Sequence, residues 1–223
     1  MSIISIIGTG DMAAAIAGRT AKAGHTVEVI NRDPAKARAL ADQLAAGAIT
    51  RTWGAAPAGD IVILAVPYTS AAAVVVEYGD ALDGKLIIDL TNPVSPDLTG
   101  LVSPAGSSGA QEIAKSAPAG AHVVKAFNTI FSPVLARGQR VDAFIAADDP
   151  EAKARVSTFI ESLGLRPLDV GALQMAQTLE SLGLMLIGVA KNGAGTWDVA
   201  FHIDDGSITD TTRSDVRELE KSR

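Results

Sequence analysis

Short apolar runs recur along the first 170 residues, and longer segments of mixed character separate them. Runs without alternating polar positions are typical of strands that are buried on both faces of a parallel sheet. Pro167 lies within the last run, which indicates an edge strand. The expected strands are at 2–7, directly before Asn31, and at 61–66, 85–90, 121–127, 141–146 and 165–170.

The segments between these runs predict helices. Asp33 followed by Pro34 is a typical helix start, because the Asp side chain caps free amides and Pro suits the first turn. Since strands and helices alternate, the predicted fold class is α/β, with a doubly wound, mostly parallel, Rossmann-like sheet. Residues 94–109 predict a long loop beside the active cleft. The expected helices are at 13–23, 35–45, 69–81, 110–116 and 150–163.

Beyond the sheet, residues 172–190 predict a helix that is apolar on most faces toward its end. Such a helix must pack over the cleft or on a second subunit, so we expect a homodimer. The predicted organisation is a dinucleotide-binding domain at 1–170, a C-terminal helical cap or dimerisation segment of the same unit at 171–203, and a polar tail at 204–223 with one short helix after Ser214.

Composition narrows the possible partners and the compartment. No apolar run reaches the roughly 18 to 20 residues that a membrane span needs, no secretory signal precedes the first strand, and the sequence has no cysteine. We therefore expect a soluble, cytoplasmic protein with no membrane partner. The net charge is −6, and no cluster of lysine and arginine is long enough to follow a phosphate backbone, which argues against nucleic acid.

The first apolar run leads into a glycine-containing turn and then a helix of small residues, which is the order of a dinucleotide-binding fingerprint. Gly8 and Gly10 allow the backbone to approach a pyrophosphate, and the amides that open the helix face its charge. Ala13 replaces the third glycine and still allows close packing of helix and strand. The cofactor-binding residues predicted here are Gly8, Thr9, Gly10, Asp11 and Met12.

The end of the second strand indicates which dinucleotide is bound. An acidic residue at this place would bind the ribose hydroxyls of NAD(H) and would repel a 2′-phosphate. The chain instead has Asn31 and Arg32, with Lys36 one turn later. A neutral donor and two cations suit a phosphate, so the predicted cofactor is NADP(H).

The three histidines, His25, His122 and His202, share no spacing that suits a metal, and no serine lies in a nucleophile elbow. We expect structural roles for all three. Hydride transfer between two stacked rings needs no general acid or base, since the protein orients the rings and excludes water. No catalytic side chain is therefore assigned.

Several motifs resemble the NADPH-dependent oxidoreductases related to F420H2:NADP oxidoreductase and, more distantly, the oxidoreductase domain of the STEAP ferric reductases. These motifs are Ile7 to Gly10, Asn31-Arg32 with Lys36, Val66 to Tyr68, Val124 to Ile130, Leu165 to Gly171 and Leu179 to Leu182. The resemblance implies a cleft where a deazaflavin stacks on the nicotinamide. It implies that the cofactor-binding residues Val66, Pro67, Tyr68, Asn92 and Pro93 line this cleft, with Asn128, Thr129 and Ile130 where hydride is transferred.

Archaeal members of that family have a histidine where this chain has Asn128, so several acceptors stay open. F420 is favoured as the small-molecule co-substrate, and FMN, FAD or riboflavin follow. One alternative is a binding module that senses NADP(H) without turnover, because folds of this kind host many functions. Another is a small imine or carbonyl reductase, although such enzymes usually have a longer helical domain than the residues after Gly171 allow.

Overall fold

The computed structural model describes residues 1–44 and 47–204, and within them the chain folds around an eight-stranded sheet. The strand order is β3-β2-β1-β4-β5-β6-β7-β8, and neighbouring strands are parallel except for the antiparallel pair β6 and β7. The predicted Rossmann-like, mostly parallel sheet is confirmed, with β8 at one edge. The strands are β1 (Ile3–Ile7), β2 (Thr26–Ile30), β3 (Ile49–Arg51), β4 (Ile61–Leu64), β5 (Leu86–Asp89), β6 (His122–Lys125), β7 (Asp142–Ala146) and β8 (Arg166–Gly171).

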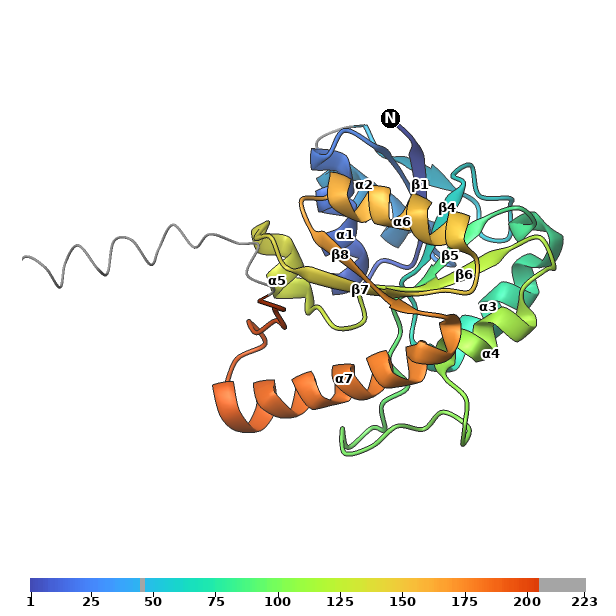
Figure 1. Cartoon of the computed structure of the whole chain (residues 1–223). Coiled ribbons are helices and arrows are strands. Elements are labelled where there is room, and N and C mark those ends of the chain that lie inside the picture. The colour runs from blue at the N-terminus through green and yellow to red at the C-terminus, as the bar shows by residue number, and fades with distance from the viewer. Residues whose placement is uncertain (45–46, 205–223) are drawn as a thin grey trace, which may run out of the picture.

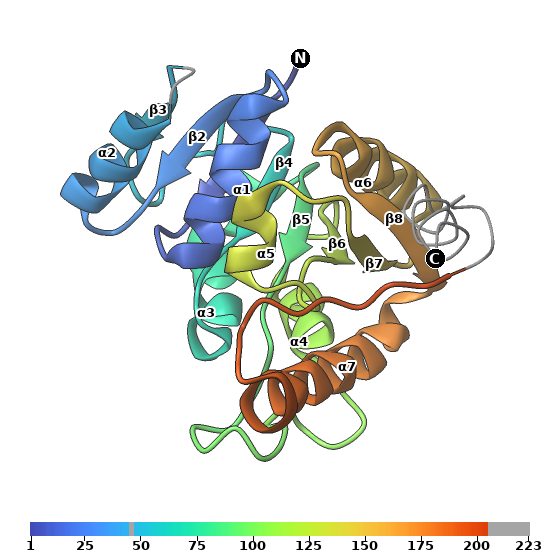
Figure 2. The ribbon, with the colours of Figure 1, turned by 90° about the vertical axis from the view of Figure 1, so that its left-hand side faces the viewer.

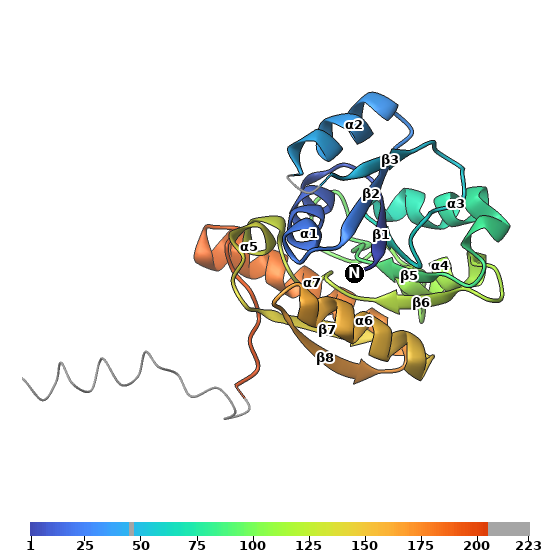
Figure 3. The same ribbon diagram turned by 90° about the horizontal axis from the view of Figure 1, so that it is seen from above.

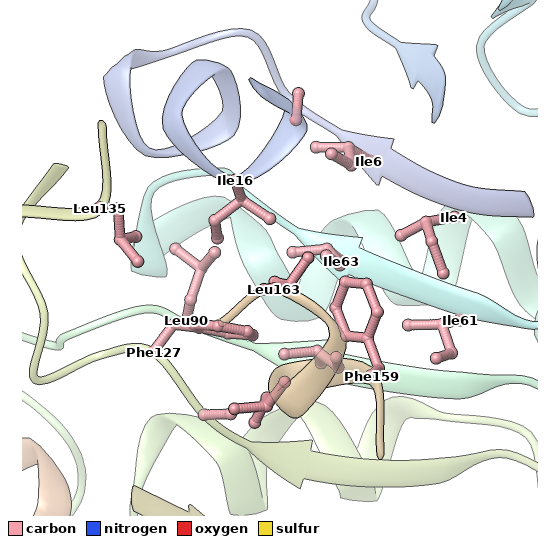
Figure 4. Packing of buried hydrophobic residues seen from close by; sticks show 14 of the residues in the cluster. Ile4, Ile6, Ile16, Ile61, Ile63, Leu90, Phe127, Leu135, Phe159 and Leu163 are labelled. Atoms are coloured by element: carbon pink, nitrogen blue, oxygen red, sulfur yellow. The ribbon is translucent and has the colours of Figure 1, made fainter. Parts of the chain in front are cut away.

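Helices cover both faces of the sheet (Figure 3). One buried cluster joins the sheet to α1, α2, α5 and α6 (Figure 4), and a second joins it to α3 and α4. The Asp33 side chain accepts from the amide of Ala35 and so caps α2, as predicted. The helices are α1 (Asp11–Lys22), α2 (Pro34–Gln43), α3 (Tyr68–Tyr78), α4 (Gly109–Ser116), α5 (Ser132–Arg137), α6 (Pro150–Ser162) and α7 (Ala176–Gly188).

Helix α7 crosses the end of the sheet at which the parallel strands β1, β4, β5 and β6 finish (Figure 1). It follows a short 3-10 turn, Leu173–Met175, and it continues into a π turn, Val189–Ala194. The predicted helix at 172–190 is thus three segments in succession. The loop at 94–108 lies at the same end of the molecule as α7 (Figures 1 and 2).

After the π turn, residues 196–203 return to the sheet as an extended strap (Figure 2). Ala200 forms an antiparallel bridge with Ile130, and the ring of Trp197 packs edge-on against Phe131 with centroids 5.1 Å apart. The amide of Ile203 donates to Oδ2 of Asp142 in β7 at 2.6 Å. The strap thereby ties the far end of α7 to the segment that follows β6.

Two elements were not predicted from the sequence. Strand β3 has the three-residue sequence Ile-Thr-Arg, which contains no apolar run, and two of its residues are exposed. Helix α5 has six residues, which is too short for a helical period to be recognised. The short helix expected after Ser214 falls outside the described residues.

Candidate functional site

The glycine turn after β1 packs directly against the end of β4. Gly8 has a φ of 128°, and a Cβ atom there would overlap the carbonyl oxygen of Ala65. Its amide donates to the carbonyl of Ile30 in β2 at 2.9 Å. Gly8 is therefore required by the contact between neighbouring strand ends, in addition to any approach of a ligand.

Gly10 is the N-cap of α1, and it leaves the start of this helix open. A Cβ atom at Gly10 would have no neighbour within 4 Å among the described residues, and no side chain caps the helix there. The first amides of an α-helix have no partner within the helix and carry partial positive charge. The turn at 8–12 can therefore receive a pyrophosphate on backbone amides.

Asn31 joins this turn to the end of β2. Its Nδ2 donates to Oγ1 of Thr9 at 2.9 Å, and its Oδ1 accepts from the amide of Asp33 at 2.9 Å. The structure therefore brings together two of the predicted cofactor-binding residues, Thr9 and Asn31. The side chain of Asn31 fixes the path of the chain from β2 into α2, where the adenosine half of a dinucleotide lies in folds of this type.

A pocket of about 340 Å³ opens beside Asn31. Three arginines contribute to its wall, Arg32 from the end of β2, Arg38 from α2 and Arg51 from β3. Such guanidinium groups bind phosphate with two parallel hydrogen bonds, which makes this the best place for a 2′-phosphate. Lys36 is exposed on α2 and is not among the lining residues. The other lining residues are Asn31, Pro34, Ala37, Thr50, Thr52 and Trp53.

Arg51 is held in the pocket wall by a buried carboxylate. It forms an ion pair with Glu28, whose side chain is fully buried and also accepts from Ser5 Oγ at 2.6 Å. Arg51 reaches this position because β3 pairs with β2, so that Arg51 is the register partner of Ile30. Arg51 and Trp53 were not predicted as site residues, because β3 was not predicted. Arg38 was not predicted either, although its helix was, because no local pattern marks which exposed cation of α2 faces the pocket.

Arg32 lies over Trp53 and is bound to Glu77 of α3. Its Cζ is 4.7 Å from the centre of the indole ring, and its Nη2 is 2.9 Å from Glu77 Oε2. Trp53 Nε1 also donates to Glu77. These hydrogen bonds, from Trp53 first and from Arg32 second, lower the pKa of Glu77. Glu77 is therefore an anion that holds Arg32 at the side of the pocket.

The ends of β4 and β5 carry the next predicted residues. Val66 is partly buried, Pro67 is exposed, and Tyr68 begins α3. Burial and the neighbouring carboxylates raise the pKa of Tyr68, so its hydroxyl stays protonated at neutral pH. Pro93 is buried, directly after Asn92.

Asn92 and Asn128 form a reciprocal pair between the ends of β5 and β6. Asn92 Nδ2 donates to the carbonyl of Asn128 at 2.7 Å, and Asn128 Nδ2 donates to Asn92 Oδ1 at 2.9 Å. Asn128 Nδ2 also donates to the carbonyl of Leu179 in α7 at 2.8 Å. The pair therefore connects two strand ends to the helix that crosses them.

The three residues expected at the place of hydride transfer lie beneath this helix and the strap. Asn128, Thr129 and Ile130 are 6%, 1% and 3% exposed. Within the described residues, Asn128 Oδ1 and Thr129 Oγ1 are buried without a hydrogen-bond partner. The resemblance implies that these residues line the cleft; in the structure they are buried, and Asn128 is bound to α7. Their role in hydride transfer stays a prediction.

None of the three histidines takes part in this arrangement. His25 shares a hydrogen bond with Ser162, while His122 and His202 lie near Asp149 and Asp142. Among residues 1–44 and 47–204, no group of three His, Asp or Glu side chains could hold a metal ion. By length and composition alone, Leu173–Ala194 could cross a membrane, which is weak evidence because core helices of soluble proteins meet the same criterion.

The residues at the strand ends fit an NADP(H) molecule in three respects. The first turn of α1 is open for a pyrophosphate, an arginine-lined pocket lies at the adenosine end, and polar side chains gather at the ends of β5 and β6. Together the Rossmann-like fold and this site define an NADP-dependent oxidoreductase.

Comparisons with known proteins give the family. The family model described as NADP oxidoreductase coenzyme F420-dependent matches residues 3–93. The F420-dependent NADP reductase of Methanothermobacter marburgensis is 30% identical over 207 residues, which cover 85% of this chain and 92% of the relative. The chain belongs to the family of F420-dependent NADP reductases.

Two further proteins are similar over most of this chain. Rat metalloreductase STEAP3 is 32% identical over 190 residues, which cover 82% of this chain but 37% of the relative. A solved structure from Arthrobacter sp. FB24, assigned as an F420-dependent NADP reductase, superposes with a TM-score of 0.80 at 26% identity and covers 91% of this chain and 99% of that one. The similarity to the metalloreductase therefore concerns about a third of its length.

Proposed function

We propose that the protein transfers hydride between NADP(H) and a flavin-like acceptor, with F420 favoured and FMN or FAD next. The observation that carries the choice of cofactor is the pocket walled by Arg32, Arg38 and Arg51 beside the end of β2. A 2′-phosphate is the dinucleotide group that matches three guanidinium groups there. The family relationship supports F420 as the acceptor, since the archaeal relative is named for it.

Each part of the site binds or orients one part of the cofactor. The amides at the start of α1 bind the pyrophosphate, and the arginine pocket binds the 2′-phosphate. The ends of β4, β5 and β6 support the nicotinamide, where Pro67 is exposed and where Asn92 is fixed by Asn128. When bound, NADPH supplies the hydride from its nicotinamide ring. The protein orients the two rings and excludes water, so no general acid or base is required.

A panel of acceptors tests the proposal. Oxidation of NADPH and of NADH is followed with F420, FMN, FAD and riboflavin, and with a cyclic imine as a separate class. The proposal predicts reduction of a flavin-like acceptor with a strong preference for NADPH. Reduction of the imine alone would support an imine reductase, and tight binding of NADPH without turnover would support a non-catalytic sensor.

The double variant Arg32→Ala, Lys36→Ala tests the cofactor preference. NADPH binding should weaken by at least about tenfold, because a charge-assisted hydrogen bond to phosphate contributes about 1.5 to 3 kcal/mol. NADH binding should stay nearly unchanged. An equal loss for both dinucleotides would contradict the assignment of NADP(H).

The assembly and compartment that we propose are a cytoplasmic homodimer in which α7 and the π turn contact a second copy. Met185 and Val189 support this proposal, since these large apolar side chains are 52% and 44% exposed. Exposed apolar side chains at such positions are typical of an interface. Sedimentation at micromolar concentration should give twice the mass of the chain, whereas a monomer there would contradict the dimer.

A further inference from the structure

A buried ionic cluster lies directly beneath α7 and is not explained by cofactor binding. Lys125 at the end of β6 donates to Asp89 Oδ2 of β5 at 2.9 Å and to Glu180 Oε1 of α7 at 2.8 Å. All three side chains are 0% exposed. Lys125 also donates to the carbonyl of Thr91 at 2.5 Å. One ammonium group thus joins two strand ends and a helix.

Glu180 extends this cluster to a second helix. Its carboxylate accepts from the amide of Gly109 at 3.1 Å and from that of Ala110 at 3.4 Å, at the start of α4. The position is confined, because a Cβ atom at Gly109 would lie 3.1 Å from Glu180 Oε1 and 3.1 Å from the ring of Tyr68. Burial raises the pKa of Glu180, and the positive charge of Lys125 opposes this shift.

A cluster of this kind is a poor source of stability, since desolvation of buried charges is comparable to their attraction. The geometry of the cluster does specify where α7 docks. Glu180 Oε2 accepts from the amide of Gly109 in α4, and Glu180 Oε1 accepts from Lys125 in β6. Helix α7 can therefore dock on the ends of β5 and β6 in one register, in which Glu180 reaches both Lys125 and the start of α4.

The same segments that hold the cluster also hold the asparagine pair. Leu179 precedes Glu180, and its carbonyl accepts from Asn128. Lys125 and Asn128 are separated by Ala126 and Phe127, and Phe127 is fully buried with a φ of 63°. A bulky residue in this left-handed region is strained and persists where its surroundings fix it. Both ends of this turn are fastened to α7.

We propose that Lys125 and Glu180 are positioning residues for the nicotinamide half of NADP(H). Their ion pair fixes the distance between α7 and the ends of β5 and β6. At this distance Asn92 and Asn128 keep their reciprocal hydrogen bonds, and the ion pair thereby sets the shape of the surface that receives the nicotinamide. The residues that would hold the adenosine half, Arg38 and Arg51, lie at the other side of β1 and do not contact this cluster. The inference rests on the proposed function for the identity of the cofactor.

The test compares NADPH with 2′,5′-ADP, which contains the phosphorylated adenosine half without the nicotinamide. Dissociation constants are measured for the whole chain and for Glu180→Gln and Glu180→Ala. Both variants keep the ion pair of Lys125 with Asp89, but Gln also keeps the side-chain volume and an acceptor oxygen at this buried position, so Glu180→Gln should fold even if Glu180→Ala does not. We expect NADPH to bind about threefold more weakly with Gln and at least tenfold more weakly with Ala, since charge-assisted hydrogen bonds are about twice as strong as neutral ones. The affinity for 2′,5′-ADP should change less than about twofold.

Glu112→Gln is the matched control, because Glu112 lies on α4 but bonds to Ser107 and to the exposed Lys115 instead of the buried cluster. It should leave both affinities unchanged. Equal weakening of NADPH and 2′,5′-ADP in the Glu180 variants would indicate a merely structural role and overturn the inference. So would unchanged binding of NADPH. These readouts need no acceptor, so a failure of the wild-type chain to reduce any flavin would contradict the proposed function and still leave the inference decided by binding.

Discussion

Gly183 of α7 lies so close to Asn92 at the end of β5 that a Cβ atom on Gly183 would be 2.6 Å from Asn92 Oδ1. Asn92 cannot turn away without breaking its two hydrogen bonds with Asn128. The helix therefore approaches the strand ends as closely as its backbone allows. This contact fixes the part of the site that we assign to the nicotinamide.

The first prediction follows from this contact. Gly183→Ala should lift α7 from Asn92, destabilise the fold by about 1 to 3 kcal/mol as overpacked positions do, and lower the rate of acceptor reduction. Gly188→Ala is the matched control in the same helix, because a Cβ atom there would meet nothing within 4 Å among the described residues. It should keep full activity and gain up to about 1 kcal/mol. Equal effects of the two substitutions on the thermal midpoint and on turnover would contradict the packing argument.

Arg38 should contribute more to NADPH binding than Lys36. Both cations are exposed on α2, but Arg38 lines the pocket and Lys36 does not. We expect Arg38→Met to weaken NADPH by about tenfold or more and Lys36→Met to weaken it by less than about threefold. Titration with NADPH and NADH for both variants measures this difference. A larger loss for Lys36→Met would mean that the 2′-phosphate binds outside the pocket.

Glu77→Gln should tighten NADPH binding. Glu77 holds Arg32 at 2.9 Å and is an anion close to the place of the 2′-phosphate. Its removal frees Arg32 and abolishes a repulsion, with an expected gain of about two- to fivefold, as for exposed ion pairs. The effect should shrink at high salt. Weaker binding of NADPH by this variant would show instead that Glu77 orients Arg32 for the ligand.

The strap should become labile in acid because of Asp142. Burial disfavours the charge of Asp142, but hydrogen bonds from Arg166 and the Ile203 amide outweigh it and hold the pKa of Asp142 below its usual value. A depressed pKa in the folded state contributes stability that is present above the unfolded pKa of about 3.9 and is lost as the pH falls through the folded value.

Thermal melting between pH 3 and pH 7 measures this contribution. Asp142→Asn should lower the midpoint at pH 7 and should flatten the decline below about pH 4. Asp42→Asn, at an exposed position on α2, is the control and should keep the wild-type profile. If the thermal midpoint of Asp142→Asn falls in acid as steeply as that of the wild type, other carboxylates cause the acid lability.

The glycine turn before α1 and the start of α2 were predictable because local sequence determines them. Gly8 and Gly10 form a turn between an apolar run and a helix, and Asn31 and Arg32 follow the next strand. The arginine pocket was not predictable in full, since Arg51 reaches it through β3, a three-residue strand that depends on its pairing with β2.

The other half of the site depends on contacts between distant segments. Lys125 is 36 residues from Asp89 and 55 residues from Glu180. The apolar pattern of 172–190 indicated a buried helix but not the surface that covers it. The burial of Asn128 follows from where α7 docks, and that depends on Gly183 and on the ionic cluster rather than on any local signal.

Transfer of deuterium tests the central claim most directly. NADPH that carries two deuterium atoms at C4 of the nicotinamide, so that either face delivers the label, is incubated with the protein and F420, and the reduced acceptor is analysed by mass spectrometry and NMR. The proposal has hydride pass directly between the two rings, so it predicts that deuterium appears on the carbon of the deazaflavin that is reduced and that equally labelled NADH reacts at least about a hundredfold more slowly. Reduction without deuterium in the acceptor, or equal rates with NADPH and NADH, would contradict the account.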